Sequence, residues 1–449
     1  MADISKTKFL IIGNSAGGIA AAEAIRGVDK NGAITVISDE PYPAYSRPLI
    51  SEYLGDHRPL ERMLYRPADF YDKNNISTML GKKVKRLDVD ARIVELEGGT
   101  TIAWSASGGL LLATGGVPII PPTKGINSKG VFTFTTLDDA KAIDEALSRT
   151  NRAVVIGGGF IGVSVTEALR KRGVAVTIVE MKERILNTIL DPEASAIEEE
   201  TLKRAGVKIV VNHTVTEVNT DGETVDGVTL DDGSKSQCGI VVLAIGVRPR
   251  TDIVAGTKIK VNRGILVDRH METSVAGVYA CGDAAEAYDF VYCEDRLSPV
   301  WPNAYLGGRV AGLNMASVPT EYAGGTGMNS MNYFGLDVAV AGVLNPPASP
   351  QAGYETLSKR NGEAYRKIVL KDGFIVGLEF VTAIEKAGII YRLMKDKVNV
   401  ESFKKQLISD DFGLLSLPDE LWRKGLEMPV KAEVSQPVAV AAAEEVHGE

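Results

Sequence analysis

The chain has 449 residues, a formal net charge of −8, 45% apolar residues and 24% charged residues. At about 150 residues per domain this length predicts about three domains with substantial cores and excludes a small disulfide scaffold. No apolar run approaches the roughly 20 residues of a membrane span, and no Lys/Arg block is dense enough for nucleic acid, so no membrane and no nucleic acid is expected as a partner. Glycine is in excess, with 46 residues against a usual share of about 7%.

The amino terminus, the cysteines and the histidines narrow the class further. The chain enters its first apolar strand by Phe9, which leaves no room for a secretion signal, so we expect a cytoplasmic protein. Cys238, Cys281 and Cys293 show no Cys-x-x-Cys or Cys-x4-Cys spacing, so a local dithiol is not predicted. The four histidines lie near no second ligand type at metal-binding spacing, so no metal site is predicted.

An internal repeat relates residues 9–40 to residues 153–180, at an offset of 144 residues. Ile12-Gly13 aligns with Ile156-Gly157, and each copy continues through a glycine-rich turn and an apolar helical pattern into a β-branched run. Each copy therefore predicts a strand, a tight turn, a helix and a second strand.

The second copy carries the complete G-x-G-x-x-G pattern in Gly157-Gly158-Gly159-Phe160-Ile161-Gly162, and Glu180 follows 23 residues after the first glycine. Glycines here permit the tight turn and the close approach of backbone N–H groups to a pyrophosphate at a helix amino terminus. A carboxylate at Glu180 accepts hydrogen bonds from a ribose 2′-hydroxyl and repels a 2′-phosphate, which indicates NAD rather than NADP. The predicted NAD contacts are Gly157, Gly159, Phe160, Ile161, Gly162, Glu180 and Gly246.

The first copy, Gly13-Asn14-Ser15-Ala16-Gly17-Gly18, has Ser15 where the second glycine would stand. It also matches the G-x-S-x-G nucleophile elbow of hydrolases, which sits on a similar strand-to-helix turn. The related copy has Gly159 at the serine position, and no histidine follows in a suitable context. With Asp39 and Glu40 closing the next strand, we interpret this copy as a second dinucleotide cradle.

Further along the chain the two halves show the same order of patterns. Residues 84–102 and 215–238 alternate apolar and polar residues, and each stretch leads into a buried strand that ends in glycine, at Gly115 and Gly246. Prolines at 118, 121 and 122, and again at 249, indicate crossings between domains. The strand before Gly282-Asp283 indicates a return to the first domain.

A third domain follows from residue 326 to about 428. Strand patterns cover residues 338–343, 365–370 and 374–380, and helical patterns cover 387–395 and 400–407. Residues 429–449 are low in complexity and have little to pack, so we expect a flexible tail.

Five spaced signatures occur in one order: the first cradle, Ala113-Thr114-Gly115, the second cradle, Ala244 to Pro249, and Tyr279 to Asp283. Together they resemble the FAD-dependent pyridine nucleotide-disulfide oxidoreductase superfamily over roughly residues 8–425. The resemblance implies an α/β fold with two Rossmann-like domains and an α+β carboxyl-terminal interface domain. An FAD-binding domain (1–115 and 248–325) would be split by an inserted NAD-binding domain (116–247), with the interface domain at 326–428.

The segment Tyr45-Ser46-Arg47-Pro48-Leu49-Ile50-Ser51 resembles the Tyr-x-Arg-Pro-x-Leu-Ser segment of ferredoxin, rubredoxin and nitrite reductase flavoproteins. There the arginine contacts FAD phosphate and the segment passes the isoalloxazine. The resemblance also implies that Asp283 binds the ribityl chain and that the helix start at Trp301 lies near the flavin. The implied FAD contacts are Gly13, Ser15, Ala16, Gly17, Gly18, Asp39, Glu40, Arg47, Pro48, Val84, Ala113, Thr114, Gly115, Gly282, Asp283, Trp301 and Ala304.

The chain departs from its disulfide-reducing relatives in one feature and from its ferredoxin-reductase relatives in another. Residues 42–50 contain no cysteine, where those members carry their redox-active one. Ferredoxin-reductase relatives often place a Lys and a Glu where this chain has Glu52 and Ser164, and those two can pair near flavin N5. We therefore place Pro48, Glu52 and Ser164 beside the flavin; the alternative for Glu52 is an acid on a helix surface.

These features predict an oxidoreductase that uses FAD and NAD. It would exchange hydride with NAD(H) and single electrons with an iron-sulfur protein, as the FAD/NAD subunits of phenylglyoxylate or aldehyde oxidoreductase complexes do. A homodimer and a hetero-oligomeric complex both remain open. The alternatives are an NADH oxidase that reduces dioxygen directly and a non-catalytic, redox-sensing flavoprotein.

Overall fold

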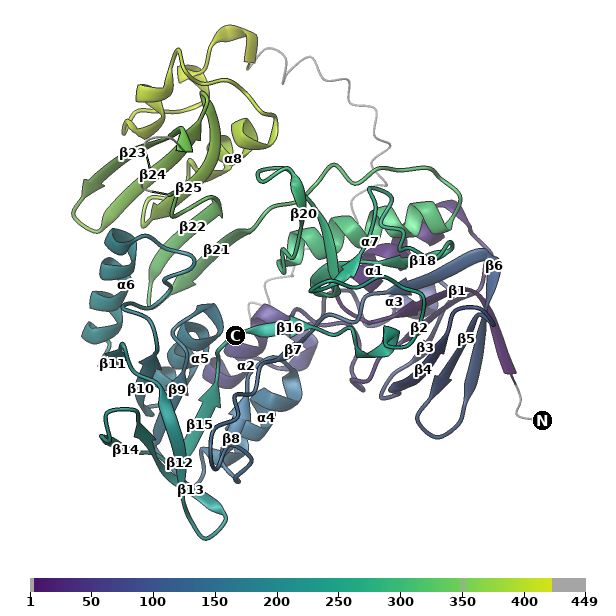
Figure 1. The fold of residues 1–449 in the computed structure, drawn as a ribbon, viewed down its shortest axis with the longest axis horizontal. Coiled ribbons are helices and arrows are strands. Elements are labelled where there is room, and N and C mark those ends of the chain that lie inside the picture. The colour runs from purple at the N-terminus through teal and green to yellow at the C-terminus, as the bar shows by residue number, and fades with distance from the viewer. Residues whose placement is uncertain (1–3, 348, 350–351, 422–449) are drawn as a thin grey trace, which may run out of the picture.

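The computed structural model describes residues 4–347, 349 and 352–421, and in it the first repeat copy has its predicted form (Figure 1). One sheet has the strand order β3-β2-β1-β6-β5-β4, with β18 added in parallel beside β6. The pairing of β18 with β6 confirms the predicted return of the chain to this sheet. Its elements are β1 (Ile4–Ile12), α1 (Ala16–Val28), β2 (Ile34–Ile37), β3 (Ile76–Met79), β4 (Val84–Asp88), β5 (Ile93–Leu96), β6 (Thr101–Leu112) and β18 (Val278–Ala280).

The second copy forms a parallel sheet of order β11-β10-β9-β15-β8. Its antiparallel meander stands apart as a separate sheet, whereas the first half joins meander and core through the single long strand β6. The break falls at Cys238-Gly239, between β14 and β15. The elements are β8 (Val131–Thr133), α4 (Leu137–Ala146), β9 (Arg152–Ile156), α5 (Phe160–Lys171), β10 (Ala175–Glu180), α6 (Pro192–Arg204), β11 (Lys208–Val211), β12 (Val215–Asp221), β13 (Thr224–Leu230), β14 (Lys235–Gln237) and β15 (Ile240–Leu243).

A two-stranded ribbon joins the two sheets where the sequence places the domain crossings. It pairs β7 (Gly116–Pro118) with β16 (Val247–Pro249) in antiparallel register. A second connection is made by η1 (Arg47–Leu49) and α2 (Ile50–Asp56), because α2 packs on α5 and its Leu54 is buried in the core of the second sheet. Gly55 permits this approach, since a Cβ there would lie 3.1 Å from the Ala168 Cα atom.

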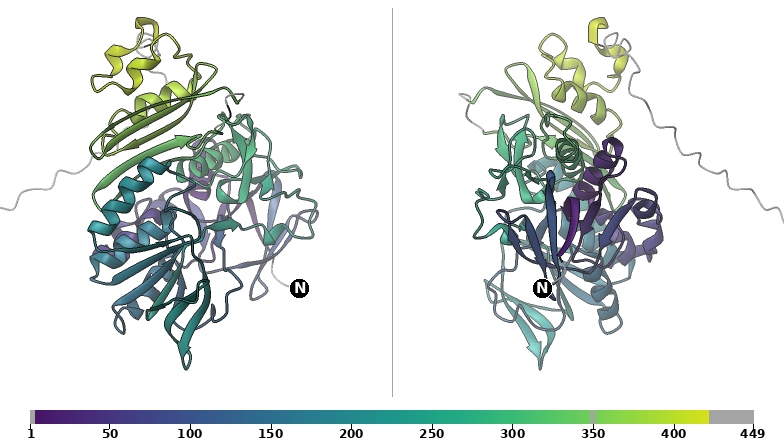
Figure 2. Two further views of the ribbon diagram at one scale, coloured as in Figure 1. Left: turned by 60° about the vertical axis from the view of Figure 1, so that its left-hand side comes forward. Right: turned by 90° about the vertical axis from the view of Figure 1, so that its right-hand side faces the viewer.

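The third sheet has the order β21-β22-β25-β24-β23 and packs above the second sheet (Figure 2). The predicted strands at 338–343, 365–370 and 374–380 are present, and the helix predicted at 387–395 is α8. Residues 400–407 do not form the predicted α-helix, because only a 3-10 helix at 404–408 is present there. The two edge strands were not predicted, since neither contains a fully buried residue. The elements are β21 (Met328–Tyr333), β22 (Leu336–Gly342), β23 (Tyr354–Asn361), β24 (Ala364–Lys371), β25 (Phe374–Val381), α8 (Ala387–Lys395), η6 (Lys404–Ile408) and η7 (Leu414–Ser416).

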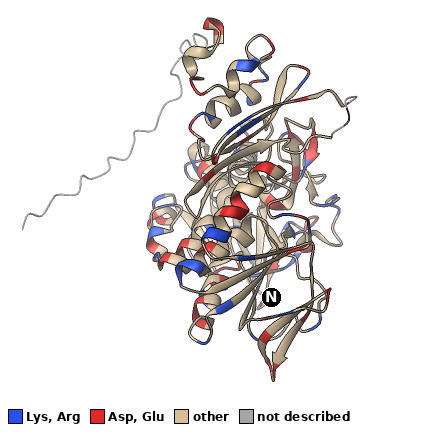
Figure 3. Cartoon of the chain, turned by 90° about the vertical axis from the view of Figure 1, so that its left-hand side faces the viewer, with Lys and Arg blue, Asp and Glu red and all other residues tan. Residues whose placement is uncertain are grey.

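Charged side chains of both signs are mixed over the molecule. Figure 3 shows positions of Lys and Arg interspersed with positions of Asp and Glu along the chain. No helix among the described residues is long and apolar enough to cross a membrane. The predicted tail, residues 429–449, lies outside the described part of the chain.

A buried ionic cluster fastens the third sheet to the second. Lys367 and Glu379 face each other on β24 and β25, and the Lys367 Nζ atom lies 2.9 Å from Asp191 Oδ2. Asp191 caps the amino terminus of α6 and also accepts a hydrogen bond from the Tyr365 hydroxyl at 2.6 Å. Burial raises the pKa of Glu379 to about 8. The carboxyl groups of Asp191 and Glu379 therefore share one ammonium group, and Glu379 keeps its proton at neutral pH.

Replacing Tyr365 by Phe tests this cluster. The substitution removes one hydrogen bond to a buried carboxylate, which contributes about 1.5 to 3 kcal/mol when the acceptor is charged. We expect the free energy of unfolding to fall by about that amount in denaturant titrations at pH 7. An unchanged midpoint would show that Asp191 is satisfied by Lys367 and its helix amides alone.

Candidate functional site

The first cradle closes tightly on the protein side. Gly13 has a φ of 122°, and a Cβ there would lie 2.0 Å from the Ala113 carbonyl oxygen. A Cβ at Gly18 would lie 1.9 Å from the carbonyl oxygen of Gly13. Ser15 is the N-cap of α1 without a capping hydrogen bond from its side chain, and no acid stands in the first turn. The amides and hydroxyl at this end of α1 suit a phosphate group.

The segment around Asp283 and the start of α7 (Trp301–Met315) converge on this cradle. A Cβ at Gly17 would lie 2.6 Å from Cys281 Sγ and 3.2 Å from the Ala304 carbonyl oxygen. Burial raises the pKa of Asp283, and the nearby charge of Arg47 counteracts part of that rise. Residues predicted from three distant parts of the chain therefore meet at one place.

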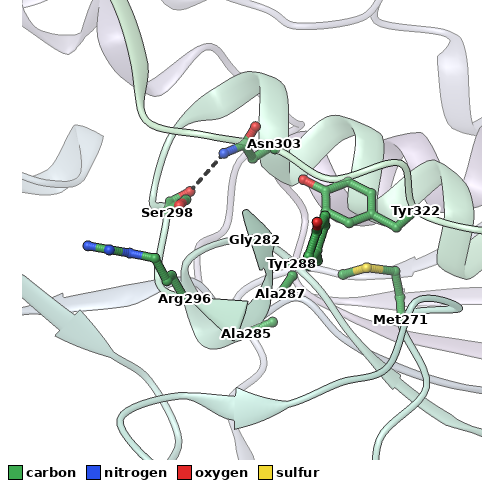
Figure 4. Close-up of a pocket in the computed structure, with 10 residues that line it drawn as sticks. Met271, Gly282, Ala285, Ala287, Tyr288, Arg296, Ser298, Asn303 and Tyr322 are labelled. Carbon is green, nitrogen blue, oxygen red and sulfur yellow. Dashed lines mark hydrogen bonds between the residues drawn. The ribbon is translucent and has the colours of Figure 1, made fainter. Parts of the chain in front are cut away.

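Behind Gly282 lies a cavity of about 20 Å³, which has room for about one water molecule (Figure 4). Side chains of Tyr288, Tyr322 and Asn303 line it, and the Asn303 amide donates to the Ser298 carbonyl oxygen at 3.3 Å. This cavity is too small for a cofactor. Residues of η4 (Gly282–Ala284), β19 (Ala285–Asp289) and β20 (Glu294–Arg296) contribute to its lining, and β17 (Ile265–Leu266) pairs with β19.

The acids that close β2 already have protein partners. Asp39 forms an ion pair with Arg250 at 2.5 Å, and Glu40 forms one with Arg47. The Tyr45 hydroxyl donates to Glu40 at 2.5 Å and accepts from the Leu137 amide at 3.0 Å. Glu40 is thereby joined through Tyr45 to the amino terminus of α4.

The remaining residues predicted for FAD lie close to Glu40 and Arg250. Gly81 N–H donates to the Glu40 carbonyl oxygen at 3.1 Å, which brings the start of β4 at Val84 close to that acid. On the other side, Thr114 Oγ1 donates to the Arg250 carbonyl oxygen at 2.8 Å. Gly115 has a φ of 71° and open space where a Cβ would be.

In the second cradle, two glycines pack closely against backbone atoms, whereas the third faces open space. A Cβ at Gly157, where φ is 105°, would lie 2.4 Å from the Ala244 carbonyl oxygen, and one at Gly162 would lie 2.0 Å from that of Gly157. A Cβ at Gly159 would meet no atom within 4 Å. Phe160 and Ile161 form the first turn of α5, which contains no acid. The open side is where a pyrophosphate would approach.

Glu180 ends β10 beside this opening. Its carboxylate accepts from the Gly158 amide at 2.7 Å and from the Lys182 amide at 2.8 Å, so both oxygens are held in place. Gly246 follows β15 on the other side of the cradle with a φ of 111°. Two glycine-rich cradles, each at a helix amino terminus and each followed by an acid after the next strand, fit two dinucleotides.

Pro48, Glu52 and Ser164 lie on two helical segments that pack together. Pro48 is in η1, Glu52 is in α2, and Ser164 is in α5. The Glu52 carboxylate pairs with Arg58 at 2.5 Å, and both side chains are partly exposed. Its partner is thus a surface arginine rather than Ser164, and the placement of these three residues beside the flavin stays a prediction.

The thiols and histidines differ in environment. Burial raises the pKa values of Cys238 and Cys281 to about 12, so both remain unreactive thiols. Contrary to the sequence reading, His213 does have acidic neighbours: Asp231 lies 2.8 Å from its Nδ1 and Asp232 lies 3.8 Å from its Nε2. The two carboxylates approach opposite ring nitrogens, which suits an ion pair more than a single metal ion.

Sequence reasoning missed three residues that shape the first site. Arg250 and Tyr45 hold Asp39 and Glu40, and the Asn14 amide donates to the Tyr42 carbonyl oxygen at 3.2 Å, which ties the cradle to the segment before Arg47. Tyr45 stands within the quoted Tyr-x-Arg-Pro segment, which was a usable signal. Arg250 and Asn14 stand next to predicted motifs but outside their defining positions.

Comparison with known proteins identifies the class. Residues 7–308 match the pyridine nucleotide-disulphide oxidoreductase family, and the chain belongs to that family. It is 29% identical to the epsilon subunit of NADH-dependent phenylglyoxylate dehydrogenase from Aromatoleum evansii, over 94% of this chain and 99% of the relative. It is 32% identical to NADH-rubredoxin oxidoreductase from Clostridium acetobutylicum, over 71% of this chain and 77% of the relative.

Other relatives are larger proteins, and the structural matches support the fold. The chain covers 49% of the nitrite reductase [NAD(P)H] of Bacillus subtilis, with 27% identity. The ferredoxin reductase structure from Rhodopseudomonas palustris superposes with a TM-score of 0.82 at 24% identity, covering 91% of this chain and 99% of that one. The predicted α/β fold with Rossmann-like units and a carboxyl-terminal sheet domain is confirmed. Family membership and the two cradles make the chain an FAD-dependent NAD(H) oxidoreductase, as predicted.

Proposed function

We propose that the protein transfers electrons between NAD(H) and a separate iron-sulfur protein, as one subunit of a larger complex. The observation that carries this proposal is the pair of glycine-rich cradles joined by the β7–β16 ribbon, in a chain that has no cysteine in residues 42–50. A disulfide reductase needs a thiol beside the flavin, so the electrons have to leave to another redox centre.

The relatives support this direction. One is named NADH-rubredoxin oxidoreductase and another is a subunit of NADH-dependent phenylglyoxylate dehydrogenase, and the second aligns over nearly its whole length. We infer that this chain likewise hands electrons to a protein partner. The partner would lie in the same compartment, which the sequence predicts to be the cytoplasm.

The proposed binding residues divide between the two cradles. Arg47, with Ser15 and the first turn of α1, would hold the FAD pyrophosphate, and Asp283 would hold its ribityl chain. Gly159 and the first turn of α5 would hold the NAD pyrophosphate, with Glu180 on the ribose. We propose the domain boundaries 1–115 with 248–325, then 116–247, then 326–428.

Bound FAD supplies the chemistry, since it accepts a hydride and releases electrons singly. The chain's own residues bind and orient. In the second cradle, Gly159 leaves the backbone amides of α5 free for the NAD pyrophosphate. In the first cradle, the amino terminus of α7 directs its positive end at the FAD site. Positioning of this kind contributes most of what a hydride transfer between two cofactors requires.

Anaerobic titration with NADH tests the proposal. The purified protein should carry flavin absorption, NADH should bleach it, and an added oxidised ferredoxin or rubredoxin should restore it. A colourless protein, or a flavin that NADH leaves oxidised, would overturn the proposal.

A second candidate is an oxidase. The chain is 31% identical to an NADH oxidase of Methanocaldococcus jannaschii over 70% of its length. Rapid NADH-dependent oxygen consumption without any partner protein would favour this alternative. Slow oxygen consumption with fast partner reduction would exclude it.

The preference for NADH over NADPH is expected to depend on Glu180. Replacing it by Gln keeps an acceptor for the Gly158 amide and removes the negative charge that would face a 2′-phosphate. We expect the KM for NADPH to fall about tenfold, which corresponds to about 1.4 kcal/mol. Steady-state assays with NADH and NADPH measure the two KM values. An unchanged ratio of these values would show that the ribose 2′ position does not lie beside Glu180.

A further inference from the structure

The turn between β21 and β22 of the third sheet reaches the helix that carries the second cradle. Tyr333 and Leu336 are the last paired residues of this hairpin, and the two residues between them, Phe334 and Gly335, have φ values of 51° and 82°. Two successive positive φ angles are the conformation of a tight two-residue hairpin turn. Asn, Asp or Gly usually stands at the first position of such a turn, so Phe334 is an uncommon residue there, and its positive φ costs about 1 kcal/mol.

Two hydrogen bonds join the turn to α5. The Tyr333 hydroxyl donates to the carbonyl oxygen of Phe160 at 3.3 Å, and the Phe334 amide donates to Glu167 Oε1 at 3.0 Å. Phe160 is the first residue of α5 and Glu167 lies two turns later, so the turn contacts the helix along most of its length. Tyr333 and Phe334 also pack against the apolar core beneath α5.

The contact at Phe160 lies directly beside the open position of the cradle. Gly159 is the N-cap of α5, and the amides that follow it form the first turn, which faces the place of a pyrophosphate. A helix amino terminus binds an anion well only when its N–H groups are held in a fixed orientation. Gly157 and Gly162 fix this orientation by their close contacts with the backbone of the second domain. The Tyr333 hydroxyl adds a contact from the third domain.

We propose that the β21–β22 turn is a positioning element of the pyridine nucleotide site. Tyr333 and Phe334 hold the first two turns of α5 in the orientation that binds the NAD(H) pyrophosphate, so the third domain sets the affinity for NAD(H) without touching the nucleotide. This inference rests on the proposed function, because it assigns the second cradle to NAD(H).

The obvious alternative is that the turn only adds stability. If the contact is purely structural, its removal lowers the unfolding midpoint and leaves nucleotide binding unchanged. If the contact positions the helix, its removal raises the KM and the dissociation constant for NADH and leaves the rate of flavin reduction at saturating NADH unchanged. The two roles therefore separate in the kinetics.

Two substitutions and two controls test the proposal in the full-length, FAD-containing protein. Tyr333→Phe removes only the hydroxyl, and Glu167→Met removes the acceptor for the Phe334 amide; each should raise the dissociation constant for NADH about fivefold in anaerobic stopped-flow experiments. Glu167→Gln keeps an acceptor oxygen and should stay within twofold of the wild type. Tyr354→Phe, on the edge strand β23 of the same sheet, is the matched control and should leave binding unchanged.

The outcomes distinguish this inference from the proposed function. If NADH bleaches the wild-type flavin and Tyr333→Phe binds NADH as tightly as the wild type does, the positioning role is wrong and the proposed function stands. If NADH fails to bleach the wild-type flavin, the proposed function is wrong as well. If Tyr333→Phe lowers the maximal rate of flavin reduction instead of the affinity, the turn acts on the reaction geometry and the inference is overturned.

Discussion

A Gly159→Val variant is expected to keep its fold and its FAD and to lose about 100-fold or more in kcat/KM for NADH. Gly159 has a φ of −82° and a ψ of −172°, an extended conformation that any residue adopts, and a Cβ there meets no protein atom within 4 Å. Added methyl groups would instead occupy the space where the pyrophosphate approaches the amides of α5. A 100-fold loss corresponds to about 2.7 kcal/mol of transition-state stabilisation.

Two further glycine variants make this test specific. Gly327→Val, at a position that is also open and free of positive φ, should leave every kinetic constant unchanged. Gly157→Ala should instead lower stability, because its φ of 105° and its 2.4 Å approach to the Ala244 carbonyl oxygen leave no place for a methyl group. Flavin absorption, thermal unfolding and NADH kinetics measure all three. Wild-type kinetics in Gly159→Val would show that NAD(H) does not use this cradle.

The sequence was most informative where structure is local. The repeat placed a strand, a turn and a helix around Gly13 and Gly157, and the structure has helices starting at Ala16 and Phe160. A glycine-rich turn between a β-branched strand and an apolar helix is defined by residues close in the chain, so spacing alone predicts it. The order of the five signatures extended this reasoning to the family.

The contacts between the parts could not be read in the same way. Arg250 reaches Asp39 across 211 positions and Tyr45 reaches Leu137 across 92, and no periodicity links such pairs. The edge strands β21 and β23 were missed for a related reason, since one side of an edge strand has no neighbour and neither strand contains a fully buried residue. The Tyr333 contact with α5 depends on one of these missed strands.

Glu52 shows the limit of reasoning from a family pattern. The family resemblance led us to expect Glu52 beside the flavin, and in the structure its carboxylate pairs with Arg58, six residues later in the chain. The direction in which a half-buried side chain points depends on the neighbours that tertiary packing supplies. Glu52 lies on α2, and α2 packs on α5, whereas the place of its carboxylate beside the flavin stays a prediction.

Glu198 on α6 combines complete burial with the lack of any hydrogen-bond partner for its carboxyl group. Its exposed fraction is 0%, and neither carboxyl oxygen has a partner among the described residues. Burial, with a contribution from the charge of Glu167, raises its pKa from 4.5 to about 8. A buried acid without partners lowers stability, because the unfolded chain can solvate the group and the folded chain cannot.

We expect Glu198→Met to stabilise the protein, with a gain that grows as the pH rises from about 4.5 to about 8. Below pH 4.5 the carboxyl group is protonated in both states and contributes nothing to the pH dependence. Between these values the unfolded chain releases a proton that the folded chain retains, so the wild type loses stability as the pH rises. The gain in free energy of unfolding should be about 3 kcal/mol larger at pH 7.5 than at pH 5.

Denaturant titrations of Glu198→Met and the wild type at these two pH values provide the measurement. Glu200→Met, on the exposed side of the same helix, is the control and should show no gain that depends on pH. Methionine has a similar length and no polar atom to leave unsatisfied, so the comparison isolates the carboxyl group. Equal gains at pH 5 and pH 7.5 would show that Glu198 titrates normally. In that case water or a conformational change must reach this carboxyl group in the folded protein.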